Sequence, residues 1–225
     1  MEDASAARAI EVLSAICDAI EQSKDYLCEL DAALGDGDHG VSMAKSFHAV
    51  KANLPGLAGE DVGYILNSTG MTLISEVGGA MGPLFGTAFL RASKVAAGKC
   101  ILSAADVAAM ISEAEAGIIQ RGKAQPGDKT MLDAVHPAAE AAQQAAASGA
   151  SLAETLAAAA DAAQAGAEAT KALVAKVGRA SRLGERTLGH QDAGATSVSI
   201  ILRVAADVLA SESAADAVAD GSAGA

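Results

Sequence analysis

A short acidic turn at residues 34–40 contains the side chains of this sequence that are best suited to chemistry. It places Asp36, Asp38 and His39 among glycines. A third carboxylate, Asp31, stands just before the turn. Neighbouring carboxylates repel one another unless they share a cation, and Mg²⁺ and Ca²⁺ prefer oxygen ligands. The turn therefore predicts a site for one or two divalent cations.

Three familiar kinds of loop can be compared with this turn. Its glycines match G-x-G-x-x-G, but a dinucleotide fingerprint follows a strand, whereas the segment before this turn has a helical pattern, and acidic residues would repel pyrophosphate. An EF-hand loop that began at Asp36 would need glycine and glutamate where Val41 and Phe47 stand. An acidic turn that only caps the next helix remains an alternative, although it explains one aspartate better than three.

The turn resembles the signature of the dihydroxyacetone kinase L subunit, the nucleotide-binding part of those kinases. Three further stretches agree with it, in the order that the family shows: GGAMGPLFGT at 78–87, GDKTMLD at 127–133, and GRAS through GHQDAGATS at 178–197. Together they extend the resemblance from about Ile10 to about Leu209. Four matches in order are far more specific than any one of them.

The resemblance implies an eight-helix antiparallel barrel with a nucleotide at one end. It assigns Asp31, Asp36 and Asp38 as metal ligands, and we expect them to hold two Mg²⁺ ions at the phosphates of ADP or ATP. The nucleotide contacts that it implies are His39, Gly40, Val41, Ser42, Ala80, Met81, Gly122, Met131, Arg179, Asp192, Ala193 and Gly194. It implies no catalytic residue beyond the metal ligands. Met81 and Ala193 depart from the serine and proline that are common in the family, so the detailed nucleotide contacts stay open.

The activity implied in this way is that of a kinase subunit. It would pass a phosphoryl group from Mg-ATP, or from tightly bound ADP recharged by a phosphoenolpyruvate-dependent phosphohistidine relay, to dihydroxyacetone (glycerone) held on a separate K subunit. The implied partners are the K subunit, a relay (M) subunit in one version of the family, and a transcription regulator in some members. The sequence does not choose between the two versions, between dihydroxyacetone and erythrulose, or between a monomer and a homodimer.

Two other classes of function remain as alternatives. One is a nucleotide-sensing adapter that binds a transcription regulator, and the other is a metal-stabilised helical bundle that binds no nucleotide. For single residues the structural alternative also stands, because Met131 suits a helix core as well as an adenine ring. Arg179 likewise suits a solvated helix end as well as a phosphate.

The elements that must position these residues are helices. The chain is rich in alanine and has 2% aromatic residues, a composition that favours closely packed helices over sheets. Apolar periodicity predicts about eight helices and no convincing strand. The expected ranges are 5–34, 39–54, 59–77, 83–97, 103–121, 130–147, 151–176 and 195–209. Capping boxes at Ser103 and Ser151 support two of the starts, and Gly122 and Asp128 are expected to end one helix and cap the next.

The loops that are rich in glycine and charge are the alternate ones, at 34–40, 78–83, 122–130 and 178–195. In an up-and-down bundle alternate loops lie at the same end, so the chemistry is predicted at one end of a single all-α domain. This domain is expected to cover residues 1–210, followed by a flexible tail at 211–225.

The overall charge and the cysteines limit the partners. The net charge of −12 disfavours nucleic acid and anionic membranes, and it would repel a nucleotide unless bound metal inverts the local charge. Cys17, Cys28 and Cys100 form no C-x-x-C pair, so buried free thiols and a cytoplasmic location are expected. The sequence lacks an apolar signal core and an uncharged apolar stretch of about 18 residues, so no membrane span is expected.

Overall fold

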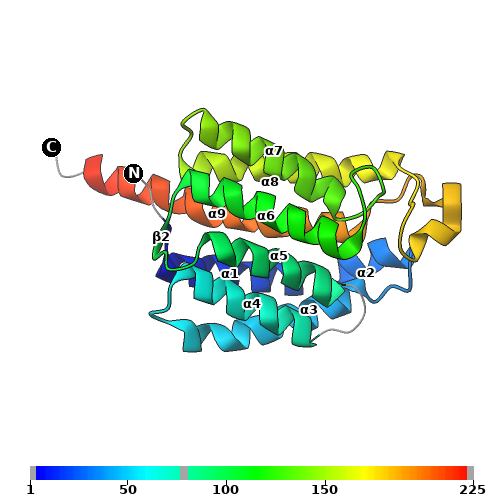
Figure 1. Ribbon diagram of the computed structural model, residues 1–225, viewed down its shortest axis with the longest axis horizontal. Coiled ribbons are helices and arrows are strands. Elements are labelled where there is room, and N and C mark those ends of the chain that lie inside the picture. The colour runs from blue at the N-terminus through cyan, green and yellow to red at the C-terminus, as the bar shows by residue number, and fades with distance from the viewer. Residues whose placement is uncertain (1–3, 77–80, 222–225) are drawn as a thin grey trace.

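Helices that run side by side along one axis make up the molecule (Figure 1). The structure, a computed structural model, describes residues 4–76 and 81–221. The α-helices in these residues are α1 (Ala6–Gln22), α2 (Lys24–Ala32), α3 (His39–Asn53), α4 (Val62–Glu76), α5 (Met81–Val95), α6 (Ala104–Gly122), α7 (Leu132–Ala147), α8 (Leu152–Ala169) and α9 (Ala193–Gly221). Short 3₁₀ helices are η1 (Leu54–Leu57), η2 (Thr170–Ala172) and η3 (Ala180–Thr187). The predicted all-α class is confirmed.

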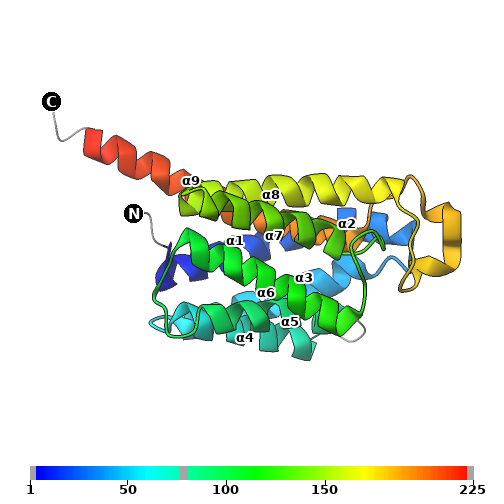
Figure 2. The ribbon, with the colours of Figure 1, turned by 45° about the horizontal axis from the view of Figure 1, so that its top comes forward.

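Apart from the short α2, the helices form a closed ring. Figure 2 shows these helices from the side, with α4 and α5 on one side of the molecule and α7 and α8 on the other. From α3 to α9 each helix packs on the next one, and α1 packs on both α3 and α9. The ring surrounds an apolar cavity of about 220 Å³, whose lining includes Leu13, Phe85, Ile111 and Val198. The predicted antiparallel barrel is thus confirmed, with its core on the barrel axis.

Small residues let the helices α7 and α8 lie close together. Their facing sides carry alanines that are fully buried, among them Ala134, Ala138, Ala159 and Ala163. Gly166 makes the closest approach, since a Cβ atom there would lie 2.1 Å from the main-chain oxygen of Asp133. The alanine-rich composition therefore serves close helix packing, as predicted.

The helix boundaries differ from the expected ones in several places. The first predicted helix is divided at Ser23 into α1 and α2, because the apolar stripe continues across a short break. Both capping boxes are present, at Ser103 and Ser151. Gly122 is the last residue of α6, and the left-handed residue after it is Lys123, with φ 55°. Helix α8 ends at Ala169, earlier than the expected 176.

Two further differences lie near the ends of the chain. A ladder of two residues pairs β1 (Ala4–Ser5) with β2 (Ile101–Leu102), and it is too short to give a periodic signal. Helix α9 continues to Gly221, past the expected end at 209. The division into a domain at 1–210 and a flexible tail stays a prediction.

One segment of α9, Ala193–Ser211, is long and apolar enough to cross a membrane by length and composition alone, with a mean hydropathy of 1.5. It carries Arg203 and Asp207, and its apolar side lines the central cavity. In the ring this segment packs on α1, α7 and α8. It is thus accounted for as a core helix of the barrel.

The three cysteines are free, as expected, but they are not all buried. Cys17 is buried in the core, and this burial raises the pKa of its thiol to about 12. Cys28 is half-buried, and Cys100 is exposed, which corrects the expectation of buried thiols.

The close contact at Gly166 leads to a stability prediction. We expect Gly166→Ala to lower the free energy of unfolding by about 2 kcal/mol, because the added methyl forces α7 and α8 apart and outweighs the better helix propensity of alanine. Urea denaturation followed by circular dichroism measures the change. Gly56→Ala is the matched control, because a Cβ atom at Gly56 meets nothing within 4 Å. Equal stability of the two variants would contradict the close packing.

Candidate functional site

The three predicted metal ligands lie together at one end of the barrel. Oxygen atoms of Asp31, Asp36 and Asp38 are all within 4.8 Å of one another. Asp31 belongs to the last turn of α2, and the other two belong to the turn that joins α2 to α3. Because Asp36 and Asp38 are exposed and Asp31 is half-buried, a cation can reach all three from solvent.

Hydrogen bonds hold the carboxylate of Asp31 in place. Its Oδ2 accepts hydrogen bonds from the main-chain N–H groups of Asp38, at 3.1 Å, and of His39, at 3.4 Å. Asp31 thus caps the start of α3 with one oxygen and keeps Oδ1 for a cation. Gly35 makes room for this arrangement, since a Cβ atom there would lie 2.6 Å from Oδ1. Three carboxylates with available oxygen atoms are the donor set that a hard divalent cation prefers.

Arg179 approaches the same carboxylates from the loop between η2 and η3. Its Nη1 forms an ion pair with Oδ2 of Asp36, and both side chains are largely exposed. A predicted nucleotide contact and a predicted metal ligand are therefore in contact, although they are 143 residues apart in the chain. The single charge of Arg179 offsets part of the acidic cluster.

His39 ties the first turn of α3 to α9. Its Nε2 lies 2.8 Å from Oγ of Ser197, and this hydroxyl donates to the main-chain oxygen of Ala193 at 3.0 Å. The hydroxyl therefore accepts from Nε2–H, which assigns the proton to Nε2. Burial lowers the pKa of His39 to about 4, and Asp31 opposes this effect. His39 is thus neutral near pH 7 and brings no positive charge to the site.

A cleft of about 570 Å³ opens beside the acidic turn. Its lining comes from all four loops that were predicted to share one end of the barrel. The predicted site residues that line it are Asp31, Asp36, Asp38, His39, Ser42, Met81, Gly122, Met131, Arg179, Asp192, Ala193 and Gly194. The volume falls in the range of small-molecule sites.

Three predicted nucleotide contacts are not part of this lining. Gly40 packs α3 on α2, since a Cβ atom there would lie 1.9 Å from the main-chain oxygen of Lys24. The side chain of Val41 is exposed on the outside of α3. Ala80 lies outside the described residues.

Met131 stands at the boundary between the cleft and the core. It is buried, it lines both the cleft and the central cavity, and it precedes the first residue of α7. A Cβ atom at Gly194 would lie 3.4 Å from Cβ of Met131, so the start of α9 is its close neighbour. Both the adenine contact and the core role fit this position.

Asp192 caps the start of α9 at the rim of the cleft. Its Oδ2 accepts from the main-chain N–H of Ala195 at 2.8 Å, and its own N–H donates to Oγ1 of Thr170 at 2.9 Å. Burial raises the pKa of Asp192 to about 6, against the lowering effect of the Ala195 hydrogen bond. The turn at Asp192 is therefore well hydrogen-bonded even with alanine at position 193.

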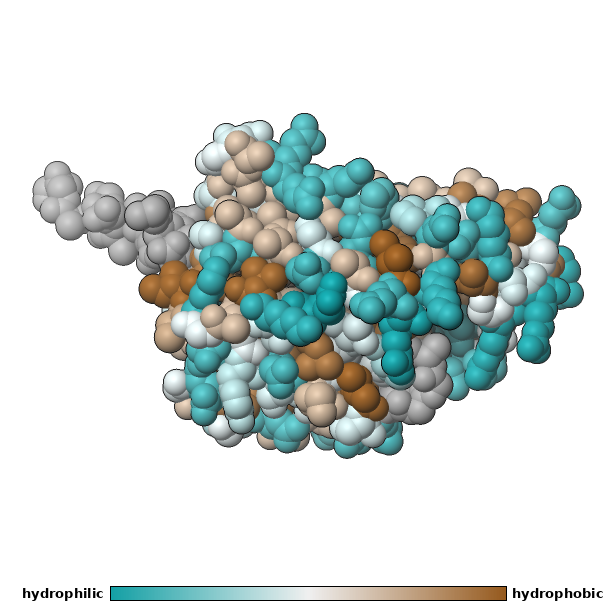
Figure 3. All heavy atoms as spheres, in the orientation of Figure 1, coloured by the Kyte–Doolittle hydropathy of each residue, from teal (hydrophilic) through white to brown (hydrophobic). Residues whose placement is uncertain are grey.

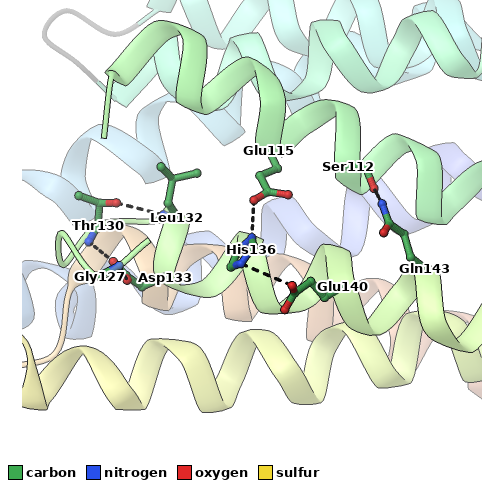
Figure 4. A network of polar contacts seen from close by, with 9 residues as sticks. All are labelled: Ser112, Glu115, Gly127, Thr130, Leu132, Asp133, His136, Glu140 and Gln143. Atoms are coloured by element: carbon green, nitrogen blue, oxygen red, sulfur yellow. Dashed lines mark hydrogen bonds and ion pairs between the residues drawn. The ribbon is translucent and has the colours of Figure 1, made fainter. Parts of the chain in front are cut away.

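A polar network that the sequence analysis missed shapes the 127–131 turn (Figure 4). The carboxylate of Asp133 accepts from the main-chain N–H groups of Gly127, at 2.5 Å, and Thr130, at 2.7 Å. Asp128, the expected cap, instead accepts from the N–H of Gln125 at 2.8 Å. The matched motif contains Asp133, but only the fold shows that this carboxylate closes the turn.

Farther along α7 the same network joins two helices. Nδ1 of His136 lies 2.6 Å from a carboxylate oxygen of Glu115 on α6, and its Nε2 lies 3.7 Å from Glu140 (Figure 4). This contact fixes α7 relative to α6, whose C-terminal end lines the cleft.

Comparison with known proteins agrees with this geometry. The DAK2 domain profile matches residues 33–207. The chain belongs to the DAK2 domain family. The resemblance seen in the sequence is thereby confirmed.

Among relatives of this DAK2 domain is the Escherichia coli PEP-dependent dihydroxyacetone kinase, ADP-binding subunit DhaL, which is 42% identical over 84% of this chain and 90% of that protein. The Lactococcus lactis PTS-dependent dihydroxyacetone kinase, ADP-binding subunit DhaL, is 37% identical over 89% of this chain and 96% of that protein. The crystal structure of the C. freundii dihydroxyacetone kinase in complex with AMP-PNP and Mg²⁺ has a TM-score of 0.70 and 26% identity. The match covers 92% of this chain and 35% of the C. freundii chain, which is larger.

The space at Gly35 leads to a prediction on the metal ligands of the DAK2 domain. We expect Gly35→Ala to weaken Mn²⁺ binding about tenfold or more, because its methyl displaces the carboxylate of Asp31. Electron paramagnetic resonance titration of Mn²⁺ measures the affinity. Gly56→Ala should bind Mn²⁺ as the wild type does, and an unchanged affinity of Gly35→Ala would show that Asp31 is not a ligand.

The buried His39 leads to a pH prediction for the metal-free protein. The folded state binds the proton of His39 only near pH 4, whereas the unfolded chain binds it near 6.5. The stability that His39 contributes is therefore complete above pH 6.5 and is lost as the pH falls toward 4, by up to about 3 kcal/mol. Urea denaturation in EDTA at several pH values should show this loss in the wild type.

The difference between variants isolates the effect of His39 from that of other titrating groups. His39→Asn should show a smaller loss between pH 6.5 and 4, while His48→Asn, which removes an exposed histidine, should follow the wild type. Parallel curves for wild type and His39→Asn would contradict the assignment.

Proposed function

We propose that this chain is the nucleotide-binding subunit of a dihydroxyacetone kinase. The observation that carries the proposal is the carboxylate cluster of Asp31, Asp36 and Asp38 at the mouth of a nucleotide-sized cleft. The cleft is lined by most of the residues that the family resemblance had implied as nucleotide contacts. The relatives named as ADP-binding subunits match nearly their whole length, which supports the same role here.

The residues present fit two Mg²⁺ ions and ADP or ATP. Asp31 would contribute Oδ1, and Asp36 and Asp38 would contribute their exposed carboxylates. Bound divalent cations neutralise charge on the phosphoryl oxygens during transfer. Arg179 can exchange its contact with Asp36 for paired hydrogen bonds to phosphate. The buried Met131 would contact the adenine ring.

The chain's own residues bind and orient the nucleotide, and the ketose would be held by a separate K subunit. The relatives named as PEP-dependent and PTS-dependent support the version in which bound ADP is recharged by a phosphohistidine relay. A cytoplasmic location belongs to this proposal. Erythrulose as the substrate, a transcription regulator as a partner and a homodimer stay predictions.

The decisive test compares the wild type with Asp36→Asn. Native mass spectrometry in Mg²⁺ should show ADP and two metal ions on the wild type, and an ATP chase should exchange this ADP slowly. We expect Asp36→Asn to lose MgADP affinity by about tenfold or more, because a shared carboxylate ligand is removed. Ketose phosphorylation in the presence of the K and relay subunits should fall with it.

The exposed Asp25 of α2 offers the matched control, and Asp25→Asn should bind MgADP as the wild type does. A wild type that binds no nucleotide at any Mg²⁺ concentration would overturn the proposed function. Binding followed by rapid exchange of the nucleotide would instead identify a subunit that uses ATP as an ordinary cosubstrate.

A further inference from the structure

A buried lysine, Lys129, lines the cleft and has no role in the function proposed above. The side chain of Lys129 is 3% exposed, although lysine is rarely buried without partners. Its backbone is in the left-handed region, with φ 62°, a conformation that costs energy for a residue with a side chain. A charged group in such a place requires an explanation in its contacts.

The ammonium group of Lys129 bonds to two main-chain carbonyls that are far apart in sequence. Nζ donates to the oxygen of Thr170 at 2.6 Å and to the oxygen of His190 at 2.5 Å. Burial lowers the pKa of Lys129, and the nearby carboxylates of Asp192 and Asp133 oppose this effect. The lysine therefore has charged and polar partners that make its burial tolerable.

The two carbonyls stand at the two ends of one segment. This segment, residues 171–189, is here called the arginine loop; it contains η3 and, just before η3, Arg179. Main-chain bonds also close its base, from Gly189 N–H to the oxygen of Lys171 at 2.8 Å, and fasten it to the 127–131 turn, from Lys176 N–H to the oxygen of Asp128 at 3.1 Å. Lys129 reaches both ends at once from that turn.

The arginine loop extends past the ring at the end where α2 lies (Figure 1), and the space-filling view shows many hydrophilic side chains on this end (Figure 3). Its residues 177–180 line the cleft, and Arg179 forms the ion pair with Asp36 across it. Within the loop, the N–H of Ala175 also donates to Oγ1 of the buried Thr187 at 3.0 Å. Because the contact of Arg179 with Asp36 is exposed and weak by itself, the position of Arg179 depends on how firmly the ends of the loop are fixed.

We propose that Lys129 is a positioning residue whose ammonium group joins both ends of the arginine loop and thereby holds Arg179 over the acidic turn. The identity of the ligand that Arg179 would bind there, a nucleotide, rests on the proposed function. Lys129 does not touch the nucleotide in this scheme; it acts through Arg179 and through the neighbouring Asp192.

Hydrogen–deuterium exchange tests, without any nucleotide, whether Lys129 holds the ends of the arginine loop. In metal-free protein, Lys129→Met should raise the exchange rates of amides in the arginine loop about tenfold, with α3 to α5 unchanged. Lys123→Met is the matched control, because Lys123 also has a left-handed backbone, with φ 55°, but is exposed. Unchanged exchange in a folded Lys129→Met would overturn the proposal. If that variant does not fold, Lys129→Gln, which keeps a donor but not the charge, replaces it. Faster exchange in the arginine loop of Lys129→Gln then supports the proposal, and unchanged exchange overturns it.

A double-mutant cycle with Arg179→Gln tests whether Lys129 acts through the arginine. By isothermal titration with MgADP, each single variant should lose affinity about tenfold, and the double variant should lose little more than either. Losses that multiply would show that Lys129 supports the fold without positioning Arg179, and would overturn the proposal. A wild type that binds no MgADP refutes the proposed function, and the exchange experiment then still decides whether Lys129 holds the loop.

Discussion

Repulsion among three carboxylates governs the end of the barrel where the cleft opens. Two unit charges at the 4.8 Å limit seen for Asp31, Asp36 and Asp38 repel by about 3 kcal/mol at the effective dielectric constant of a protein surface. The chain as a whole carries a net charge of −12, and at this cluster the single charge of Arg179 offsets only part of the repulsion. Positive charge would stabilise such an arrangement, and bound cations would also accept the phosphates of a nucleotide.

The barrel determines where that charge can be supplied. Successive helices run up and down, so the loops that carry glycine and charge meet at one end, and each brings one kind of group. The α2–α3 turn brings carboxylates, the 127–131 turn brings a buried cation, and the loop before η3 brings Arg179. Asp31 joins the carboxylate cluster to the fold directly, because the same carboxylate caps α3. A change at the site is therefore also a change at the start of a helix.

The sequence predicted those features that depend on local pattern. Apolar periodicity located the helices, and the boxes at Ser103 and Ser151 located two starts. The alternation of loops predicted that four of them line one cleft. The break between α1 and α2 at Ser23 was not predicted, because the apolar stripe continues across it. The left-handed conformation of Lys123 was not predicted, because glycine adopts a positive φ more easily and Gly122 was therefore the better candidate for the end of the helix.

The contacts that shape the site could not be predicted, since they join residues far apart in the chain. His39 meets Ser197 across 158 residues, and Lys129 meets His190 across 61. Neither partner lies on a shared element whose period would reveal it. The matched motifs identified these positions as members of a family pattern, but the neutral state of His39 and the burial of Lys129 are properties of the packed barrel.

The contact between α9 and α1 has a consequence for biosynthesis. Helix α1 can close the ring only after α9 has been synthesised, because these two helices pack on each other. Until the segment from Ala193 onward is translated, the ring of helices is open. Its apolar inner face, which later lines the central cavity, is then exposed to solvent. Closure of the ring thus depends on the synthesis of α9, and a nascent chain with such an exposed apolar face is a substrate for chaperones until then.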